Sequence, residues 1–250
     1  LPISDDIDPA QTDTAFPQKN FNPVLYTGNG SDGHAITGVG FQPDLVWLKK
    51  RSAAASHQLY DSSRGTGKVL SSDNTDAEAS YSTVLQSFDS DGFTLGTSAA
   101  INGSSATMVG WCWRANGGTT ASNSDGSITS TVQANTAAGF SIITYTGDEN
   151  AGTIGHGLSA KPDLIFFKSR DTSDDWGVYH SAIGATNALT GLSSSAGLYN
   201  YTIFNNTEPT TSVITLGAAG SVGRYRNNKA STNYIAYCWH SVEGYSKFGS

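Results

Sequence analysis

The chain has 250 residues, of which only 14% are charged and 28 are glycine, and its formal net charge is −7. This composition, rich in Ser, Thr, Gly, Asn and Tyr, favours strands and turns over helices. The acidic balance disfavours a nucleic-acid partner, because binding to phosphate backbones depends on clustered cations. No apolar run approaches the ~18 residues that a membrane-spanning helix needs, so we expect no membrane insertion.

The first 21 residues differ in composition from the rest of the chain. They carry Asp, Pro and Gln but few large apolar side chains, which predicts an extended lead-in over residues 1–21. The first residue is Leu and not Met, so we expect a segment of a longer polypeptide.

An internal repeat organises the remainder. The sequence VLYTG at 24–28 returns as ITYTG at 143–147, and PDLVWLKKR at 43–51 returns as PDLIFFKSR at 162–170. Both pairs are 119 positions apart. The repeat predicts two homologous units over residues 22–118 and 139–250, joined by a linker over 119–138.

Within each unit, short apolar runs alternate with turn dipeptides such as Asn-Gly and Asp-Gly about every ten residues. This spacing is typical of antiparallel sandwiches, so we predict an all-β fold of two antiparallel β-sandwich units in tandem, jelly-roll or concanavalin A-like. In the strand expected at 45–51, the alternation predicts a buried start and a solvated end. Helix signals are scarce, and we expect a turn or two of helix at 74–79, with Asn74 or Thr75 as the cap.

Several motifs of this chain are similar to those of one known family. They are LYTGNG at 25–30, TGVGFQPD at 37–44, LYDS with RG at 59–65, SDGF at 90–93 and VEGYSKFGS at 242–250. They resemble repeat modules of tail or tail-fibre-like proteins of marine tailed phages, which often sit beside concanavalin A-like or SPRY-type domains. The resemblance implies a virion protein of a tail appendage, extracellular after release, with a β-sandwich fold. Trimeric assembly is common in such appendages, so the resemblance also implies a homotrimer.

Asp44 and Asp163 occupy matching positions at strand entrances and each follows a proline. A carboxylate there caps a turn or meets a cation across the strand, and we favour such a structural role. The matching cations are expected to form intramolecular ion pairs or to lie at the strand edge, with binding of a carboxylated or sulfated sugar as the alternative. These cations are Lys49, Arg51, Lys168 and Arg170.

Two Asp/Asn-rich turns have the alternating oxygens of calcium loops. Asp89 and Asp91 in DSDG at 89–92 are the calcium candidates, and NSDG at 123–126 has the same form. Because Asp-Gly also makes the commonest hairpin turns and neither segment has a downstream bidentate Glu, we favour turns. We expect no other cofactor.

The candidate ligand-binding residues lie where the two units diverge in sequence. Exposed tyrosines among amides are typical of saccharide sites, because flat rings contact C–H faces while amides bond hydroxyls; packing in the core or at its rim is the alternative. The candidates are Tyr199, Asn200, Tyr201, Asn205, Asn206 and Trp176.

The sequence offers little support for catalysis. The five His residues are scattered, Gly-x-Ser-x-Gly is absent, and Cys112 and Cys238 each lie between aromatics on expected core strands. Two carboxylates converging for glycoside cleavage remain an alternative. The carboxylates available for this are Asp61, Asp89, Asp174, Asp175, Glu208 and Glu243.

We therefore expect a virion-associated module that adheres to a cell-surface polysaccharide or glycan. The alternatives are a structural spacer or decoration that contacts other virion proteins, and a polysaccharide-degrading hydrolase or lyase.

Overall fold

The computed structural model describes residues 17–192 and 197–249. It is an all-β structure in which every pair of neighbouring strands is antiparallel, as predicted. The helical segments within these ranges are the single turns η2 (Pro17–Lys19), α1 (Ala99–Asn102) and η3 (Arg224–Arg226). Among the residues described, no helix has the length and apolar character to cross a membrane.

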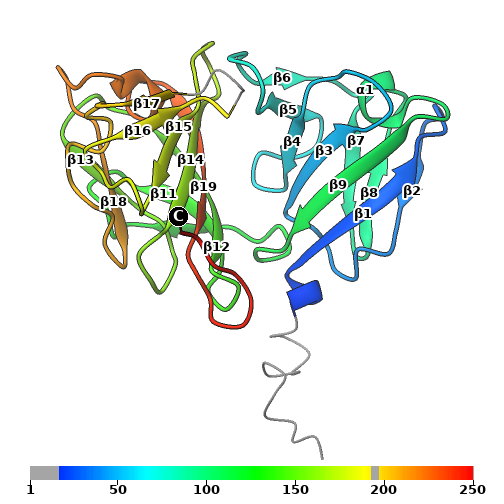
Figure 1. Ribbon diagram of the computed structural model, residues 1–250, viewed down its shortest axis with the longest axis horizontal. Helices are drawn as coiled ribbons and strands as arrows, with labels where there is room; N and C mark the ends of the chain where they lie inside the picture. The colour runs from blue at the N-terminus through cyan, green and yellow to red at the C-terminus, as the bar shows by residue number, and fades with distance from the viewer. Residues whose placement is uncertain (1–16, 193–196, 250) are drawn as a thin grey trace, which may run out of the picture.

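Residues 21–113 form a six-stranded and a three-stranded sheet (Figure 1). The six-stranded sheet has the order β1 (Phe21–Thr27), β9 (Thr107–Trp113), β3 (Leu45–Lys50), β4 (Gln58–Asp61), β5 (Lys68–Ser71) and β6 (Ala79–Ser80). The smaller sheet has the order β2 (His34–Ile36), β8 (Gly92–Leu95) and β7 (Leu85–Asp89). An apolar core that includes Val46, Leu48, Phe93 and Leu95 lies between the two sheets.

Residues 121–239 form an eight-stranded and a two-stranded sheet. The larger has the order β10 (Ala121–Asn123), β11 (Ser130–Asn135), β12 (Phe140–Thr146), β19 (Asn233–Trp239), β14 (Leu164–Ser169), β15 (Gly177–His180), β16 (Ala188–Thr190) and β17 (Gly197–Tyr199). The smaller consists of β13 (Gly152–Gly155) and β18 (Val213–Leu216). A second core, with Ile165, Phe167, Ile154 and Ile214, lies between them.

The strand order β1-β9-β3-β4-β5-β6 is repeated as β12-β19-β14-β15-β16-β17. Side-chain contacts are repeated too: the Tyr26 hydroxyl donates to the Ile101 carbonyl oxygen at 2.7 Å, and the Tyr145 hydroxyl donates to the Asn227 carbonyl oxygen at 2.6 Å. The large sheets share no strand among the described residues. These matches support the predicted doubling, although the exact unit boundaries stay a prediction.

Two local expectations were wrong. Residues 119–138 were expected to be a linker, but β10 and β11 lie there and extend the eight-stranded sheet through pairing with β12. Residues 74–79 are not helical, because the Asn74 side chain accepts the Asp76 amide proton at 3.1 Å in a local turn that competes with a helix. The predicted lead-in over 1–21 lies outside the described residues up to 16, and β1 already begins at Phe21.

A third core lies between the six-stranded and eight-stranded sheets. Leu45 on β3 and Phe166 on β14 pack into it, whereas their neighbours Val46 and Ile165 face the other way into the two sandwich cores. Successive side chains on a strand point to opposite faces, so both faces of these sheets are apolar and buried. The start of β3 is buried and its end is partly exposed, as its alternation predicts.

Charged groups also cross the interface between the two large sheets. Arg64 pairs with Asp61 and donates to Glu78 at 3.1 Å, and Glu78 accepts two further hydrogen bonds from Arg170 at 2.9 and 3.0 Å. The Tyr237 hydroxyl donates to Asp61 at 2.7 Å. We call these five side chains the interface ion network. They connect residues 61–78 with β19 and with the end of β14.

The two cysteines are buried on β9 and β19 and are free thiols, as expected for core positions. Burial raises the pKa of Cys112 to about 12 and raises that of Cys238 as well. Because the thiolate is the reactive form, we expect neither thiol to react with a thiol-specific reagent at pH 8 in the folded protein, and both to react in urea. Labelling followed by intact-mass measurement tests this; modification of either cysteine faster than global unfolding would contradict it.

Candidate functional site

Tyr199 and Tyr201, two of the predicted binding residues, lie together at the edge of the eight-stranded sheet. Tyr199 ends β17, the last strand of that sheet, and its side chain is 47% exposed. The rings of Tyr199 and Tyr201 are stacked, with centroids 5.1 Å apart and planes 13° from parallel. The pair therefore presents a flat aromatic surface supported by a second ring.

A guanidinium covers the second ring. Arg226 lies 4.8 Å from the Tyr201 ring centroid and donates to Asp175 at 2.8 Å. The position of Arg226 is set by η3, of which it is the last residue. The helix begins after Gly223, whose backbone is in the left-handed region, φ +79°. A Cβ at Gly223 would come within 3.2 Å of Tyr201, so glycine allows η3 to pack directly on the tyrosine.

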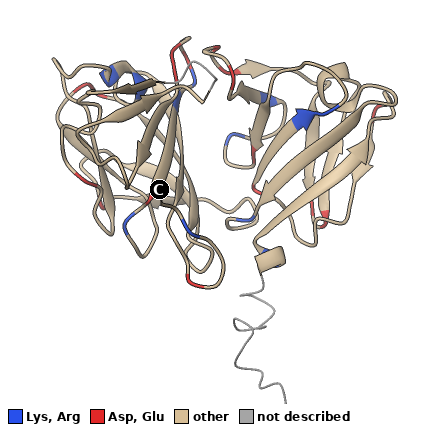
Figure 2. Ribbon diagram, in the orientation of Figure 1, with Lys and Arg blue, Asp and Glu red and all other residues tan. Residues whose placement is uncertain are grey.

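The same short helix carries a second aromatic–cation cluster. The Arg224 guanidinium stacks on Tyr225 at 4.2 Å and its Nε donates to Glu149 at 2.6 Å, while the Lys229 ammonium lies 5.9 Å from the Tyr225 centroid. Tyr225 is 43% exposed. Figure 2 shows the blue cations at η3 on a largely tan ribbon. We call both clusters the η3 patch: Tyr199, Tyr201, Tyr225, Arg224, Arg226 and Lys229.

The other predicted binding residues differ in their environment. Asn200 is exposed between the two tyrosines. Asn205 and Asn206 are exposed in a left-handed turn, φ 48° and 53°, anchored by the buried Ile203 and Phe204. No side-chain hydrogen bond joins either amide to a described residue of the patch.

The prediction for Trp176 was wrong. Its side chain is fully buried in the core between the two large sheets, and its indole N–H donates to the Ser71 carbonyl oxygen at 2.9 Å. Trp176 therefore has no face for a ligand. Sequence reasoning did not identify Arg224, Arg226, Tyr225 or Lys229, because none lies in a recognised motif and they come close to the tyrosines only through the fold.

An aromatic groove opens at one end of the core between the large sheets. It has a volume of about 280 Å³ and is walled by rings from both sheets and from the C-terminal segment. Its lining comprises Phe21, Trp47, Trp113, Leu164, Phe166, Trp239, Tyr245, Ser246 and Phe248. Trp113 lies 6.0 Å from Trp239 across the interface. The groove has few groups that could bond sugar hydroxyls, so it suits a saccharide less well than the η3 patch does.

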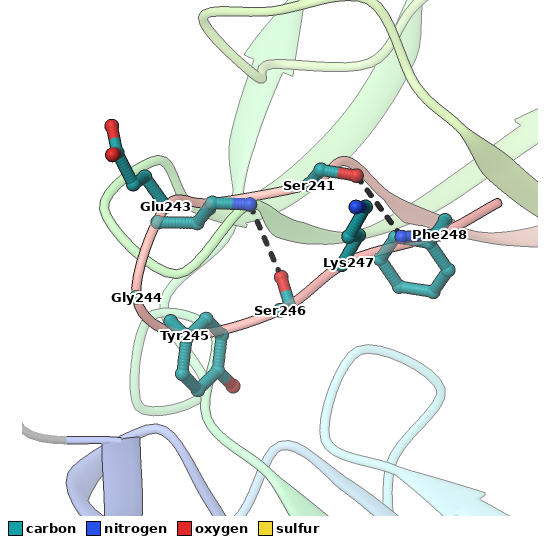
Figure 3. A pocket seen from close by; sticks show the side chains of 8 residues that line it. Ser241, Glu243, Gly244, Tyr245, Ser246, Lys247 and Phe248 are labelled. Atoms are coloured by element: carbon teal, nitrogen blue, oxygen red, sulfur yellow. Dashed lines mark hydrogen bonds between the residues drawn. The ribbon is translucent and has the colours of Figure 1, made fainter.

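A more open cavity of about 590 Å³ lies against the C-terminal hairpin (Figure 3). A single segment, residues 241–248, forms its whole lining. The Val242 amide donates to the Ser246 carbonyl oxygen at 3.0 Å, and the Phe248 amide donates to the Ser241 hydroxyl at 3.1 Å. Figure 3 shows Glu243 pointing away from Phe248. This cavity is the inner side of a turn, whereas a binding site usually gathers groups from several elements.

The calcium candidates serve as turn residues. Asp91 accepts the amide protons of Gly38 and Gly40 at 3.0 and 2.6 Å, and these bonds hold its pKa below the ordinary value. Asp89 accepts the Thr94 hydroxyl at 2.7 Å. Within the described residues, no group of three or more His, Cys, Asp or Glu side chains is placed to hold a metal ion. These contacts fit the hairpin interpretation that we favoured.

The matching aspartates have the structural role expected of them. Asp44 is fully buried and accepts the Ser62 hydroxyl at 2.7 Å and three backbone amide protons at 2.6 to 2.9 Å. Asp163 accepts both the amide and the hydroxyl of Ser241 at 2.7 and 2.8 Å. The two carboxylates thus fasten the start of β3 and of β14 to the loop after the neighbouring strand.

The strand-end cations also contact their own chain. Lys168 is buried and donates to the carbonyl oxygens of Thr75 and Asp174 at 3.1 and 2.8 Å; burial lowers its pKa to about 8. Lys49 donates to the Ala55 carbonyl oxygen at 2.7 Å, and Arg51 is exposed. Together with the Arg170–Glu78 pair, these contacts favour the structural interpretation over binding of an acidic sugar at these strand ends.

The carboxylates considered for glycoside cleavage lie in separate contacts. Asp61 is in the interface ion network and Asp175 is bound to Arg226. Glu208 bonds Lys161 at 2.6 Å and the Tyr179 hydroxyl at 2.5 Å. Neither the aromatic groove nor the C-terminal cavity contains two of these acids in its lining. The geometry therefore gives the enzymatic alternative no specific support.

The fold and the η3 patch define an all-β protein of antiparallel sheets with an exposed aromatic–cation surface. A family model described as Domain of unknown function (DUF7483) matches residues 16–250, so the chain belongs to that family. No curated protein matches the chain. The search of solved structures also gave no match.

Proposed function

We propose that this chain is a virion-associated, tail-fibre-like module whose η3 patch adheres to a glycan on the host cell surface. The observation that carries the proposal is the stacked pair of Tyr199 and Tyr201, in which Tyr199 is 47% exposed and Tyr201 is covered at its rear by Arg226. The motif resemblance described above supports the virion setting, a tail appendage that is extracellular after release.

The chemistry of the patch suits a sugar ring. The C–H face of a pyranose packs on a flat aromatic ring, and guanidinium and amide groups bond the hydroxyls around its edge. Tyr199 supplies the ring, and the exposed Asn200 next to it in the chain supplies an amide, while Arg226 supports the pair from behind Tyr201. Because the patch is an open surface, we expect weak binding at each site, strengthened when several copies act together in a homotrimer or on a virion.

Replacing Tyr199 with alanine should weaken glycan binding by about tenfold, because the sugar loses its stacking surface. A glycan array probed with the multivalent protein, followed by titration of the best hit, measures the effect. Tyr81→Ala is the matched control: Tyr81 is also an exposed tyrosine, 56%, but lies after β6 in the first unit and should leave binding unchanged.

The array also decides between the alternatives. Absence of any hit at high protein concentration would contradict adhesion and favour a spacer or decoration that contacts other virion proteins. Release of reducing sugar from host polysaccharide would instead favour a hydrolase or lyase. Equal loss of binding in the Tyr81 and Tyr199 variants would contradict the assignment to the η3 patch.

A further inference from the structure

We infer that one side of the strand pair β1 and β9 is the surface through which copies of this chain associate. This surface comprises Pro23, Leu25, Val109 and Trp111, and we call it the β1–β9 face. It belongs to the six-stranded sheet, whereas the η3 patch lies at the far edge of the eight-stranded sheet (Figure 1). The inference is therefore independent of the proposed glycan-binding function.

The alternation of the two strands turns all four side chains to the same side of the sheet. The members of the β1–β9 face alternate along the chain with residues of the sandwich core of the first unit, such as Val24 on β1 and Met108 on β9. Successive side chains on a strand point to opposite sides. The β1–β9 face is therefore turned away from that core.

The four side chains form two rows of direct neighbours. Leu25 pairs with Val109 in one row, and Pro23 pairs with Trp111 in the next. Leu25 is 68% exposed, the largest fraction among the exposed large apolar side chains of the described residues, and Pro23 is exposed as well. Val109 and Trp111 are partly exposed. A single exposed leucine is ordinary, but a contiguous apolar surface marks a site of interaction.

The β1–β9 face continues an interface that the chain already contains. Trp111 pairs with Trp47 on β3, and their ring centroids are 5.9 Å apart. Trp47 in turn packs against the core between the two large sheets. The same side of the six-stranded sheet is thus covered along β3, β4 and β5, where Leu45, Leu59 and Leu70 are buried in that core, and exposed at Leu25 on β1.

The internal repeat shows what kind of surface covers such a face. Ile142 on β12 and Ile235 and Tyr237 on β19 hold the equivalent positions in the second unit. All three are 0% exposed and belong to the core between the large sheets. Their partner is thus a sheet of the homologous unit. Because this face of the second unit is already occupied within the chain, a second copy can offer the β1–β9 face of its own first unit.

The contact is expected between faces and not between strand edges. β1 is the edge strand of its sheet, but Pro23 has no N–H to donate to a further strand, so strand addition there is disfavoured. Like faces can instead meet around the rotation axis of a symmetric assembly. Burial of apolar surface favours this association, whereas the formal net charge of −7 on each copy opposes it.

Sedimentation velocity of the full chain over a range of concentrations tests the inference. We expect a reversible oligomer of two or three copies, and we expect Leu25→Asp and Leu25→Lys each to weaken association by about tenfold or more. Variants of opposite charge are used because loss of an apolar contact predicts the same effect for both. A chain that stays monomeric at submillimolar concentration, or an oligomer that both variants leave intact, would overturn the inference.

An exposed leucine on the other large sheet provides the matched control. Leu198 on β17 is 56% exposed, and Leu198→Asp should leave association unchanged. Loss of association in this variant as large as in Leu25→Asp would contradict the assignment to the β1–β9 face. Because Leu25 is exposed, the dilute Leu25→Asp chain should keep the urea midpoint of the parent monomer, which separates loss of association from unfolding.

Salt distinguishes an apolar contact from ion pairing between copies. Raising the NaCl concentration screens the repulsion between two acidic chains, so association through the β1–β9 face should become tighter. Association that weakens with salt would show that charged groups hold the copies together, and would overturn the inference.

Cross-linking gives a positive readout at the contact itself. Leu25→Cys places an exposed thiol on the β1–β9 face, whereas the two native cysteines are buried. A short bismaleimide should join copies of this variant through residue 25, and Leu198→Cys should remain uncrosslinked at the same concentration. Equal cross-linking of the two variants, or none through residue 25, would overturn the inference.

Discussion

The Arg64→Met variant is expected to unfold with a free energy about 3–5 kcal/mol below that of the parent chain, because it leaves buried carboxylate charge without its cation. The side chains of Arg64 and Asp61 are both 0% exposed, and that of Glu78 is 9% exposed. The guanidinium also donates to the Leu59 carbonyl oxygen at 3.0 Å and to the Tyr237 hydroxyl at 3.3 Å. Equilibrium unfolding in urea measures the change.

A pair on the surface provides the control. Lys161 and Glu208 are bonded at 2.6 Å, but their side chains are 43% and 45% exposed. Lys161→Met should therefore cost no more than about 1 kcal/mol. Losses of similar size in the two variants would show that the interface ion network adds nothing beyond an ordinary surface pair.

The network also gives stability a dependence on acid. Burial acts to raise the pKa of Glu78, but hydrogen bonds from Arg170 and the charge of Arg64 prevail and hold it below the ordinary value. A carboxyl whose pKa is lower in the folded state contributes stability that is fully present above its unfolded pKa, ~4.3, and is lost as pH falls through its folded pKa. In Glu78→Gln, the decline in stability below about pH 4 should be shallower than in the parent chain.

The second large effect is expected at Asp44. Replacing its carboxylate with an amide should lower the free energy of unfolding by about 3 kcal/mol. The NH₂ group of the amide cannot accept the hydrogen bonds that a carboxylate oxygen accepted, so buried donors lose their acceptor. Those donors are the Ser62 hydroxyl and the backbone amides of Ala115, Gly117 and Gly118. The loss is measured by urea unfolding of Asp44→Asn.

The internal repeat supplies the matched comparison. Asp163→Asn changes the equivalent carboxylate, which is only partly buried; it bonds the amide and hydroxyl of Ser241 and the side chain of Ser181, and so accepts one backbone amide where Asp44 accepts three. We expect a loss of about 1 kcal/mol there. A loss at Asp163 as large as that at Asp44 would show that burial and the number of donors do not set the effect.

Periodicity and repetition were enough to predict the class of fold. Short apolar runs separated by Gly-rich turns predicted antiparallel strands. The 119-residue shift related β3 to β14, and the structure pairs these two strands with β9 and β19, which hold the same place in their sheets. The buried thiols and the carboxylates at strand entrances followed from the same repeat. These features depend on neighbours in sequence or on one strand face, so local patterns determine them.

Local patterns were less informative about the segment between the repeats. Residues 119–138 have a composition typical of a linker, yet β11 pairs with β12 along five residues. β11 lies between β10 and β12 and places a single large apolar side chain, Val132, in the core, so its mostly polar composition did not reveal a strand. The helix predicted at 74–79 does not form: the Asn74 side chain holds a local turn, and Glu78 is bonded to Arg64 and Arg170 across the interface.

The sequence by itself determined that this chain forms antiparallel sheets, that one pattern of residues occurs twice in it, and that tyrosines and amides gather between residues 199 and 206. Only the tertiary structure decided that Trp176 is core and that Arg226 covers Tyr201. An aromatic side chain has the same chemistry in a core as on a surface, and its environment depends on how the large sheets face each other. The η3 patch likewise joins residues distant in the chain, because packing of η3 on the sheet edge brings its cations to the tyrosines.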